Sequence, residues 1–173
     1  DRYSFMLENN EVVGCHKCGL EGVSELGQYY PFHRSLSLAF RFISKSDHKP
    51  SVIYRIHAPN HFEHGDWYDG GKCDRTVPFR EGEYAGRESD RQLQTIAREE
   101  FVDARGRNGV RLEILDIYHL LLLRPDGHPD RYRGAEGSVR DCLHWCMPGP
   151  IDAWSDLMME MVFRNANSST RFS

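Results

Sequence analysis

The sequence contains no apolar run approaching the roughly 20 residues that a helix needs to cross a bilayer. Residues 1–30 also lack a basic flank followed by an apolar stretch, so no signal peptide is predicted within them. Charge of one sign is not concentrated anywhere, because the 22 basic and 26 acidic residues are interspersed. A phosphate-tracking surface needs clustered basic residues, and the sequence therefore argues against nucleic acid as a partner.

The first residue is Asp1 rather than methionine, and we expect further sequence upstream. Cysteine, in contrast, is frequent for a chain of this size, at positions 15, 18, 73, 142 and 146. Together with a formal N-glycosylation acceptor at residues 167–169, these cysteines indicate the secretory pathway, where disulfides form. An odd count leaves one cysteine over, so the sequence alone leaves the pairing open.

Hydrophobic periodicity predicts three helices. A helix is expected from Ser24 as N-cap to about residue 43, with Pro31 bending or restarting it. A second is expected over residues 93–104, ending at Gly106 and Gly109. A third covers residues 154–162, behind Asp152 as N-cap.

Two short segments read as strands, a β-branched and aromatic run at 52–56 and an alternating run at 110–115. A further apolar run at 120–123 precedes the loop 124–129, and residues 59–87 form a long polar loop of the kind that is usually functional or disordered. The order helix, strand, helix, strand, helix predicts an α/β fold with parallel strands and crossover helices.

The segment Asp141-Cys142-Leu143-His144-Trp145-Cys146 has the strongest functional pattern. An Asp and a His three residues apart can share one side of a turn, so the carboxylate can fix the imidazole tautomer while the other ring nitrogen takes a proton from a serine. That is acyl-transfer chemistry without its nucleophile. By itself the spacing is also compatible with a surface Asp and a packed His.

The chain resembles the trichome-birefringence-like proteins of plants over nearly its whole length. The resemblance is carried by several blocks: Val13–His16, Pro59–Glu63, Gly65–Trp67, Gly70–Cys73, Thr76–Phe79, Arg124–Pro129 and Asp141–Asp152. It implies an incomplete SGNH-esterase-like three-layer fold, with residues 1–163 as the C-terminal part of the acyltransferase domain and residues 164–173 as a polar tail. The segments around Cys15 and Pro59 are most similar to the branch that acetylates xyloglucan.

This resemblance implies transfer of acetyl groups to cell-wall polysaccharides by a Golgi type II membrane protein, whose anchor would lie upstream. No cofactor and no metal are expected. His144 matches the family's general base and Asp141 its orienting partner, whereas the Gly-Asp-Ser triplet that carries the serine is missing, since Gly65-Asp66 is followed by Trp67. Without the serine this stretch alone is expected to be inactive. The alternatives are a catalytically inactive polysaccharide-binding protein or truncated gene product, and an esterase that hydrolyses instead of transferring.

Arg55, His61 and Trp67 are candidates for substrate binding, because ligands of parallel sheets bind beyond the carboxyl ends of the strands. The alternative is that Arg55 pairs with a loop acid and Trp67 packs in the core. For Asp126 and His128 we favour structural roles, with Asp126 capping its turn and His128 packing beneath the Asp141–His144 loop.

The cysteines admit two interpretations. Cys15 and Cys18 could form a zinc site with Cys142, His144 and Cys146, although 123 residues separate the two groups. The secretory context favours disulfides instead. A bridge from Cys142 or Cys146 to Cys15 or Cys73 would brace the Asp-x-x-His loop.

Overall fold

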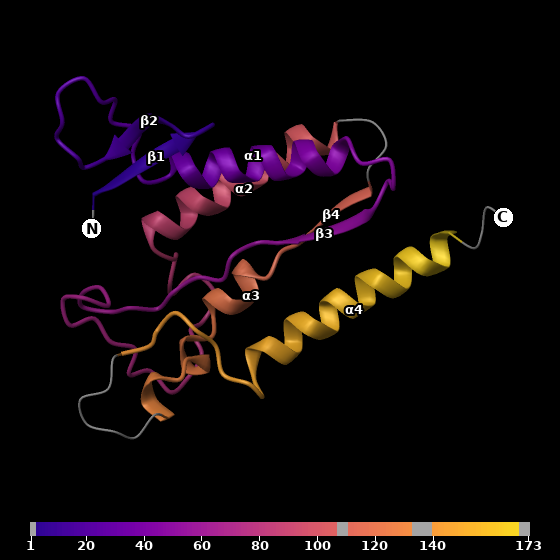
Figure 1. Cartoon of the computed structure of the whole chain (residues 1–173). Helices are drawn as coiled ribbons and strands as arrows, with labels where there is room; N and C mark the ends of the chain where they lie inside the picture. Colours follow the sequence, from indigo (N-terminus) through magenta and orange to yellow (C-terminus); the bar gives the residue numbers. More distant parts are fainter. Residues whose placement is uncertain (1–2, 107–110, 133–139, 170–173) are drawn as a thin grey trace. The chain divides into compact units, whose positions relative to one another are not determined.

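The computed structural model describes residues 3–106, 111–132 and 140–169 (Figure 1). Contacts divide the chain into two compact units, one formed by Asp1–Val52 with Thr95–Leu112 and the other by Ile53–Gln94 with Glu113–Ser173. All residues singled out above for catalysis or substrate binding belong to the second unit. Each unit is described separately below.

The first unit opens with a hairpin that the sequence analysis did not predict. Strands β1 (Ser4–Glu8) and β2 (Glu11–His16) pair antiparallel, with an irregular register between Met6 and Leu7. Asn9 and Asn10 form the turn with φ of 52° and 66°, a left-handed conformation that asparagine tolerates better than most residues. The missed signal is this Asn-Asn pair between two apolar stretches.

The helix expected from Ser24 begins only at Tyr30, so the predicted start was wrong. Helix α1 spans Tyr30–Ser44 and carries Pro31 in its first turn, where the missing N–H of proline costs no helical hydrogen bond. Residues 24–26 instead pair with β2: the N–H of Cys15 donates to the carbonyl of Ser24 at 2.8 Å, and that of Leu26 donates to the carbonyl of Cys15 at 2.8 Å. The apolar residues that suggested a helix there belong instead to a segment that pairs with β2 as a short strand would.

The second unit contains most of a two-stranded sheet of β3 (Ser51–Arg55) and β4 (Arg111–Leu115), connected through helix α2 (Glu88–Arg105). The two strands run in the same direction (Figure 1), which confirms the predicted mixed α/β class and the parallel pairing across a crossover helix. Both strands lie within one residue of their predicted ranges, whereas α2 begins at Glu88, five residues before the predicted start, and ends as expected. Val110, the predicted first residue of β4, lies outside the described residues.

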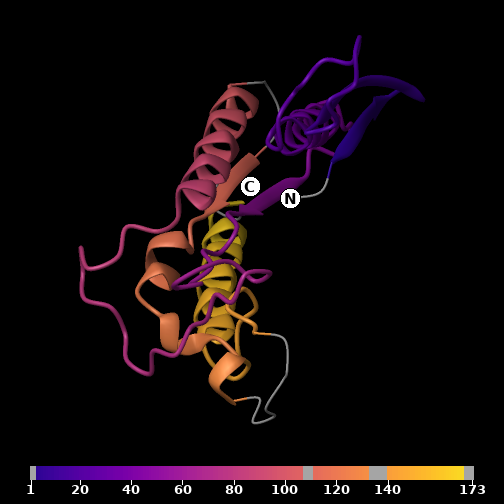
Figure 2. The same cartoon turned by 90° about the vertical axis from the view of Figure 1, so that its left-hand side faces the viewer.

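A short helix, α3 (Tyr118–Leu122), takes up most of the apolar run that follows β4. Leu115, Ile117, Leu121 and Trp145 form the core cluster, with the partly buried side chains of Ile151, Trp154 and Met161 packed against it. The last three belong to helix α4 (Pro150–Ser169), which Figure 2 shows in yellow beside the orange segment that carries α3. Burial of this apolar surface holds α4 against residues of β4 and α3.

Helix α4 starts at Pro150, four residues before the predicted range of 154–162. Asp152 lies inside its first turn and accepts a hydrogen bond from the N–H of Gly149 at 2.7 Å, so it stabilises the helix start without being the N-cap. The helix continues to Ser169, past the boundary at residue 163 that the sequence analysis drew before a polar tail. Among the described residues, no helix is long and apolar enough to cross a membrane.

Candidate active site

Asp141 and His144 form a hydrogen-bonded pair on the loop before α4. The Nδ1 of His144 lies 3.0 Å from Oδ1 of Asp141, and the backbone N–H of His144 donates to the same oxygen at 2.9 Å. Burial would raise the pKa of Asp141, but the hydrogen bonds from His144 and Leu143 outweigh it and lower that pKa below the ordinary value. The carboxylate therefore holds a proton on Nδ1 of the imidazole.

The two side chains differ sharply in exposure, since that of Asp141 is 9% exposed and that of His144 75% exposed. With Nδ1–H directed at the carboxylate, Nε2 of His144 is the ring nitrogen left to accept a proton. An anchored carboxylate and an accessible imidazole nitrogen are what a general base needs in order to activate a hydroxyl nucleophile. The arrangement predicted from the Asp-x-x-His spacing is present.

The loop that carries this pair is fixed at several points along its backbone. The N–H of His61 donates to the carbonyl of Cys142 at 3.0 Å, and the N–H of Cys146 donates to the carbonyl of Gly127 at 2.9 Å. A disulfide joins Cys142 to Cys73 in the long polar loop. The geometry of the Asp141–His144 pair thus depends on segments more than 60 residues upstream. Of the bridges that the sequence left open, from Cys142 or Cys146 to Cys15 or Cys73, the structure contains Cys142–Cys73.

The disulfides also decide the zinc question. Cys15 pairs with Cys18 and Cys73 with Cys142, so three of the sulfurs proposed as zinc ligands are bonded to other sulfurs. The zinc interpretation of the cysteines was wrong for this structure. Asp130 lies close to the second bridge, where Cys73, Cys142 and Asp130 meet, and its buried carboxylate pairs with Arg140 at 3.2 Å. The ion pair with Arg140 offsets the charge of this carboxylate.

Two buried histidines lie directly beneath the loop 141–146, which carries Asp141 and His144 and is called the Asp–His loop below. His61 and His128 are 1% and 2% exposed, and their facing nitrogens, Nδ1 and Nε2, are 2.7 Å apart. The Nδ1 of His128 contacts the carbonyl of His144 at 2.7 Å, and the ring packs on Trp145 with centroids 4.1 Å apart. The position predicted for His128 beneath the loop is confirmed.

Asp126 does not cap its turn as predicted. Its two carboxylate oxygens accept hydrogen bonds from Nε and Nη2 of Arg124, both at 2.9 Å. The bond to Arg124 is the main reason that the pKa of Asp126 is lowered. This pair borders a cavity of about 360 Å³ that is also lined by Tyr132, Cys146 and Pro148, so an anionic and a cationic group face a hollow beside the Asp–His loop.

The three predicted substrate-binding residues have different neighbours. Arg55 lies with its guanidinium 5.1 Å from the ring centroid of Trp154 on α4. His61 is buried, which argues against its direct contact with a sugar. Trp67 is 64% exposed and meets the ring of Tyr68 edge to face, with centroids 5.5 Å apart. Of the three, Trp67 is the one whose ring is open to a ligand.

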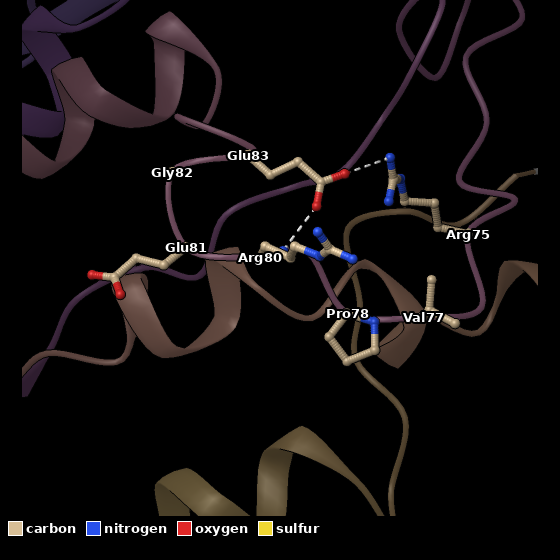
Figure 3. Close-up of a pocket in the computed structure, with 7 residues that line it drawn as sticks. All are labelled: Arg75, Val77, Pro78, Arg80, Glu81, Gly82 and Glu83. Atoms are coloured by element: carbon tan, nitrogen blue, oxygen red, sulfur yellow. Dashed lines mark hydrogen bonds and ion pairs between the residues drawn. The ribbon is translucent and has the colours of Figure 1, made fainter.

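A hollow that the sequence analysis missed lies over residues 75–83 of the long loop (Figure 3). It encloses about 600 Å³ and is lined by two Arg and two Glu side chains, together with Val77, Pro78 and Gly82. The Glu83 carboxylate lies between Arg75, at 3.0 Å, and the backbone N–H of Arg80, at 2.9 Å. Charges of both signs in a loop look like an ordinary solvated surface, so only the folded loop reveals the hollow.

An aromatic stack links this hollow to the buried histidines. The guanidinium of Arg75 lies 4.2 Å from the ring centroid of Phe79, which stacks on Tyr84 with centroids 4.9 Å apart. Tyr84 in turn packs on His61 with centroids 5.3 Å apart. These ring contacts join parts of the long polar loop to one another, and His61 extends them to His128 and Trp145 outside the loop.

The buried histidines should make stability depend on pH. Burial is the main cause that lowers the pKa of His61 to about 4 and that of His128 below its ordinary value. Between pH 6.5 and 4 the unfolded chain binds more protons than the folded chain. The free energy of unfolding therefore keeps its full value above pH 6.5 and decreases as the pH is lowered toward 4. The contribution of His61 to this decrease is on the order of 3 kcal/mol.

Urea unfolding of the chain at pH 7 and pH 4.5 measures this dependence. The variant His61→Asn should show a smaller fall between the two pH values, whereas His48→Asn, at an exposed position, should behave like the parent chain. An unchanged fall in His61→Asn would show that other groups carry the dependence.

The fold and the site together define a class: an α/β protein with a loop-borne Asp–His pair whose geometry is that of a base able to activate a hydroxyl. In agreement, the chain belongs to the GDSL/SGNH-like acyl-esterase family found in Pmr5 and Cas1p, called PC-esterase, whose model matches residues 2–161. The resemblance to trichome-birefringence-like proteins is confirmed by the individual relatives.

The chain is 41% identical to protein trichome birefringence-like 26 of Arabidopsis thaliana, over 88% of this chain and 37% of that protein. It is 42% identical to trichome birefringence-like 25, over 90% of this chain and 38% of the relative. It is 36% identical to xyloglucan O-acetyltransferase 1 of the same plant, over 91% of this chain and 38% of that protein. The chain thus spans less than half the length of the relatives it matches.

Proposed function

We propose that this chain supplies the Asp–His half of the active site of an O-acetyltransferase that acts on plant cell-wall polysaccharide. The observation that carries the proposal is the hydrogen bond of Asp141 to Nδ1 of His144, which leaves Nε2 on an exposed ring. Relatives named for xyloglucan O-acetylation support the reaction class. Xyloglucan is our first choice of acceptor, ahead of other hemicelluloses and pectin.

The proposed chemistry has two steps. Nε2 of His144 removes the proton from a serine hydroxyl as its oxygen attacks the carbonyl of the acetyl donor, and His144 then protonates the leaving group, which gives acetyl-serine. In the second step His144 removes the proton from a sugar hydroxyl, whose oxygen attacks the carbonyl of acetyl-serine. The ester bond to serine breaks, the sugar keeps the acetyl group, and His144 returns the proton to the serine oxygen. Asp141 stabilises the imidazolium formed in each step.

The serine must come from elsewhere, because no Gly-Asp-Ser triplet occurs in the 173 residues. We propose that another part of the complete protein supplies it, that the chain is a C-terminal part of that protein, and that an upstream anchor places it in the Golgi membrane with this domain in the lumen. The missing triplet also supports a second candidate, a polysaccharide-binding protein without catalysis.

The decisive experiment gives the complete protein p-nitrophenyl acetate as donor and xyloglucan oligosaccharides as acceptor. Mass spectrometry of the oligosaccharides and an assay for free acetate separate the outcomes. Acetylated oligosaccharide supports the transferase, acetate released equally with and without acceptor indicates a hydrolase, and binding without either product indicates the inactive alternative.

In the same assay Trp67→Ala tests acceptor binding. The loss of an exposed ring on which a sugar can lie should raise KM for the acceptor about fivefold and change kcat little, whereas Trp67→Phe should keep most of the affinity. An unchanged KM in Trp67→Ala would remove Trp67 from the acceptor site.

A further inference from the structure

His61 and His128 are held between two backbone carbonyls. His61 points Nε2 at the carbonyl of Leu122, 3.0 Å away, and Nδ1 at Nε2 of His128, 2.7 Å away. His128 points Nδ1 at the carbonyl of His144, 2.7 Å away. The series therefore contains three contacts: a carbonyl to a ring, a ring to a ring, and a ring to the carbonyl of the proposed catalytic residue.

Each of these contacts needs one proton, because carbonyl oxygens only accept and two bare imidazole nitrogens repel. Two neutral rings supply two protons. A third would complete the series but would place a cation in a buried site, and burial outweighs the nearby carboxylates in lowering the pKa of both rings. Those carboxylates are already paired: Asp126 with Arg124, Asp130 with Arg140 and Asp141 with His144.

Two protons can satisfy neighbouring contacts in two ways. In one, both rings carry the proton on Nδ1, so that His61 donates to His128 and His128 donates to the carbonyl of His144. In the other, both carry it on Nε2, so that His128 donates to His61 and His61 donates to the carbonyl of Leu122. The first arrangement places protons on the two shorter contacts, both 2.7 Å, and leaves the 3.0 Å contact without one.

We infer that His61 and His128 form a directed hydrogen-bond chain that ends on the carbonyl of His144, and that both are positioning residues for the Asp–His loop. The role in catalysis rests on the proposed function, whereas the direction of the chain does not. The backbone N–H of His61 also donates a hydrogen bond to the carbonyl of Cys142. This one residue therefore fixes the loop at two points, once directly and once through His128.

The direction can be read from the tautomers. Nitrogen-15 NMR of the complete protein at pH 7, labelled at histidine, should show both His61 and His128 protonated on Nδ1, with scalar coupling between Nδ1 of His61 and Nε2 of His128 across the hydrogen bond. Protonation of both rings on Nε2 would reverse the chain and overturn the inference, as would the absence of a proton between the rings. None of these outcomes depends on whether the protein transfers acetyl groups.

Matched variants test the positioning role in the complete protein. His128→Leu removes the donor to the His144 carbonyl and should lower kcat about tenfold with KM for the acceptor unchanged, because a misplaced base slows chemistry without affecting binding. His128→Asn keeps an N–H donor close to the Nδ1 position and should retain at least about a third of kcat. Equal losses in both variants, or full kcat in His128→Leu, would overturn the positioning role while leaving the proposed reaction intact.

Discussion

Replacing His144 by Ala in the complete protein is expected to lower kcat for acetyl transfer by about 10⁴- to 10⁶-fold. The substitution removes the base that takes the serine proton, and in a triad the loss of the base costs about as much as the loss of all three members. Its structural cost should be small, because the side chain is 75% exposed. The rate is measured from the acetylated oligosaccharide, by mass spectrometry, and from the free acetate released.

Two variants control this result. His48→Ala removes an exposed histidine of the first unit and should leave kcat unchanged. Asp141→Asn keeps the shape of the side chain but loses the charge that stabilises the imidazolium, so we expect a fall of roughly 10³- to 10⁴-fold. If His144→Ala kept more than a few per cent of the parent rate, the assignment of His144 as general base would be wrong.

The double variant Cys73→Ala, Cys142→Ala is expected to lower the free energy of unfolding by about 4 kcal/mol. The bridge joins two cysteines with a sequence separation of 69 and so restricts the conformations of the unfolded chain. Without the bridge the unfolded chain gains conformational entropy, which stabilises it relative to the folded state. The substitution also releases the loop that carries Asp141 and His144, so activity should fall with stability. Urea unfolding of protein made in an oxidising compartment gives the free energy.

The second disulfide provides the comparison. Cys15 and Cys18 are only three residues apart, so the same argument gives roughly 2 kcal/mol for their removal. Cys146→Ser should cost less than either, because Cys146 belongs to neither bridge. Peptide mapping of the oxidised chain checks the pairing directly, and a peptide that links Cys146 to Cys142 or Cys73 would contradict this account.

The local parts of the fold could be predicted because local sequence determines them. β3 and β4 follow from β-branched and alternating runs, and α2 from a clear helical period. The start of α1 could not be predicted in the same way, since the periodic residues from Leu26 onward continue through a segment whose backbone hydrogen bonds go to β2. Periodicity reports which face is apolar and not which backbone partner is available.

The sequence by itself determined the family, the Asp–His pair and the chemistry that this pair can perform, because three-residue spacing on one loop is a local property. Only the tertiary structure decided what holds the pair in place. The Cys73–Cys142 bridge, the His61–His128 contact and the hydrogen bond to the His144 carbonyl join segments separated by 69, 67 and 16 residues. Such partners are selected by burial and by the need to satisfy buried polar groups, and neither is visible in a linear pattern.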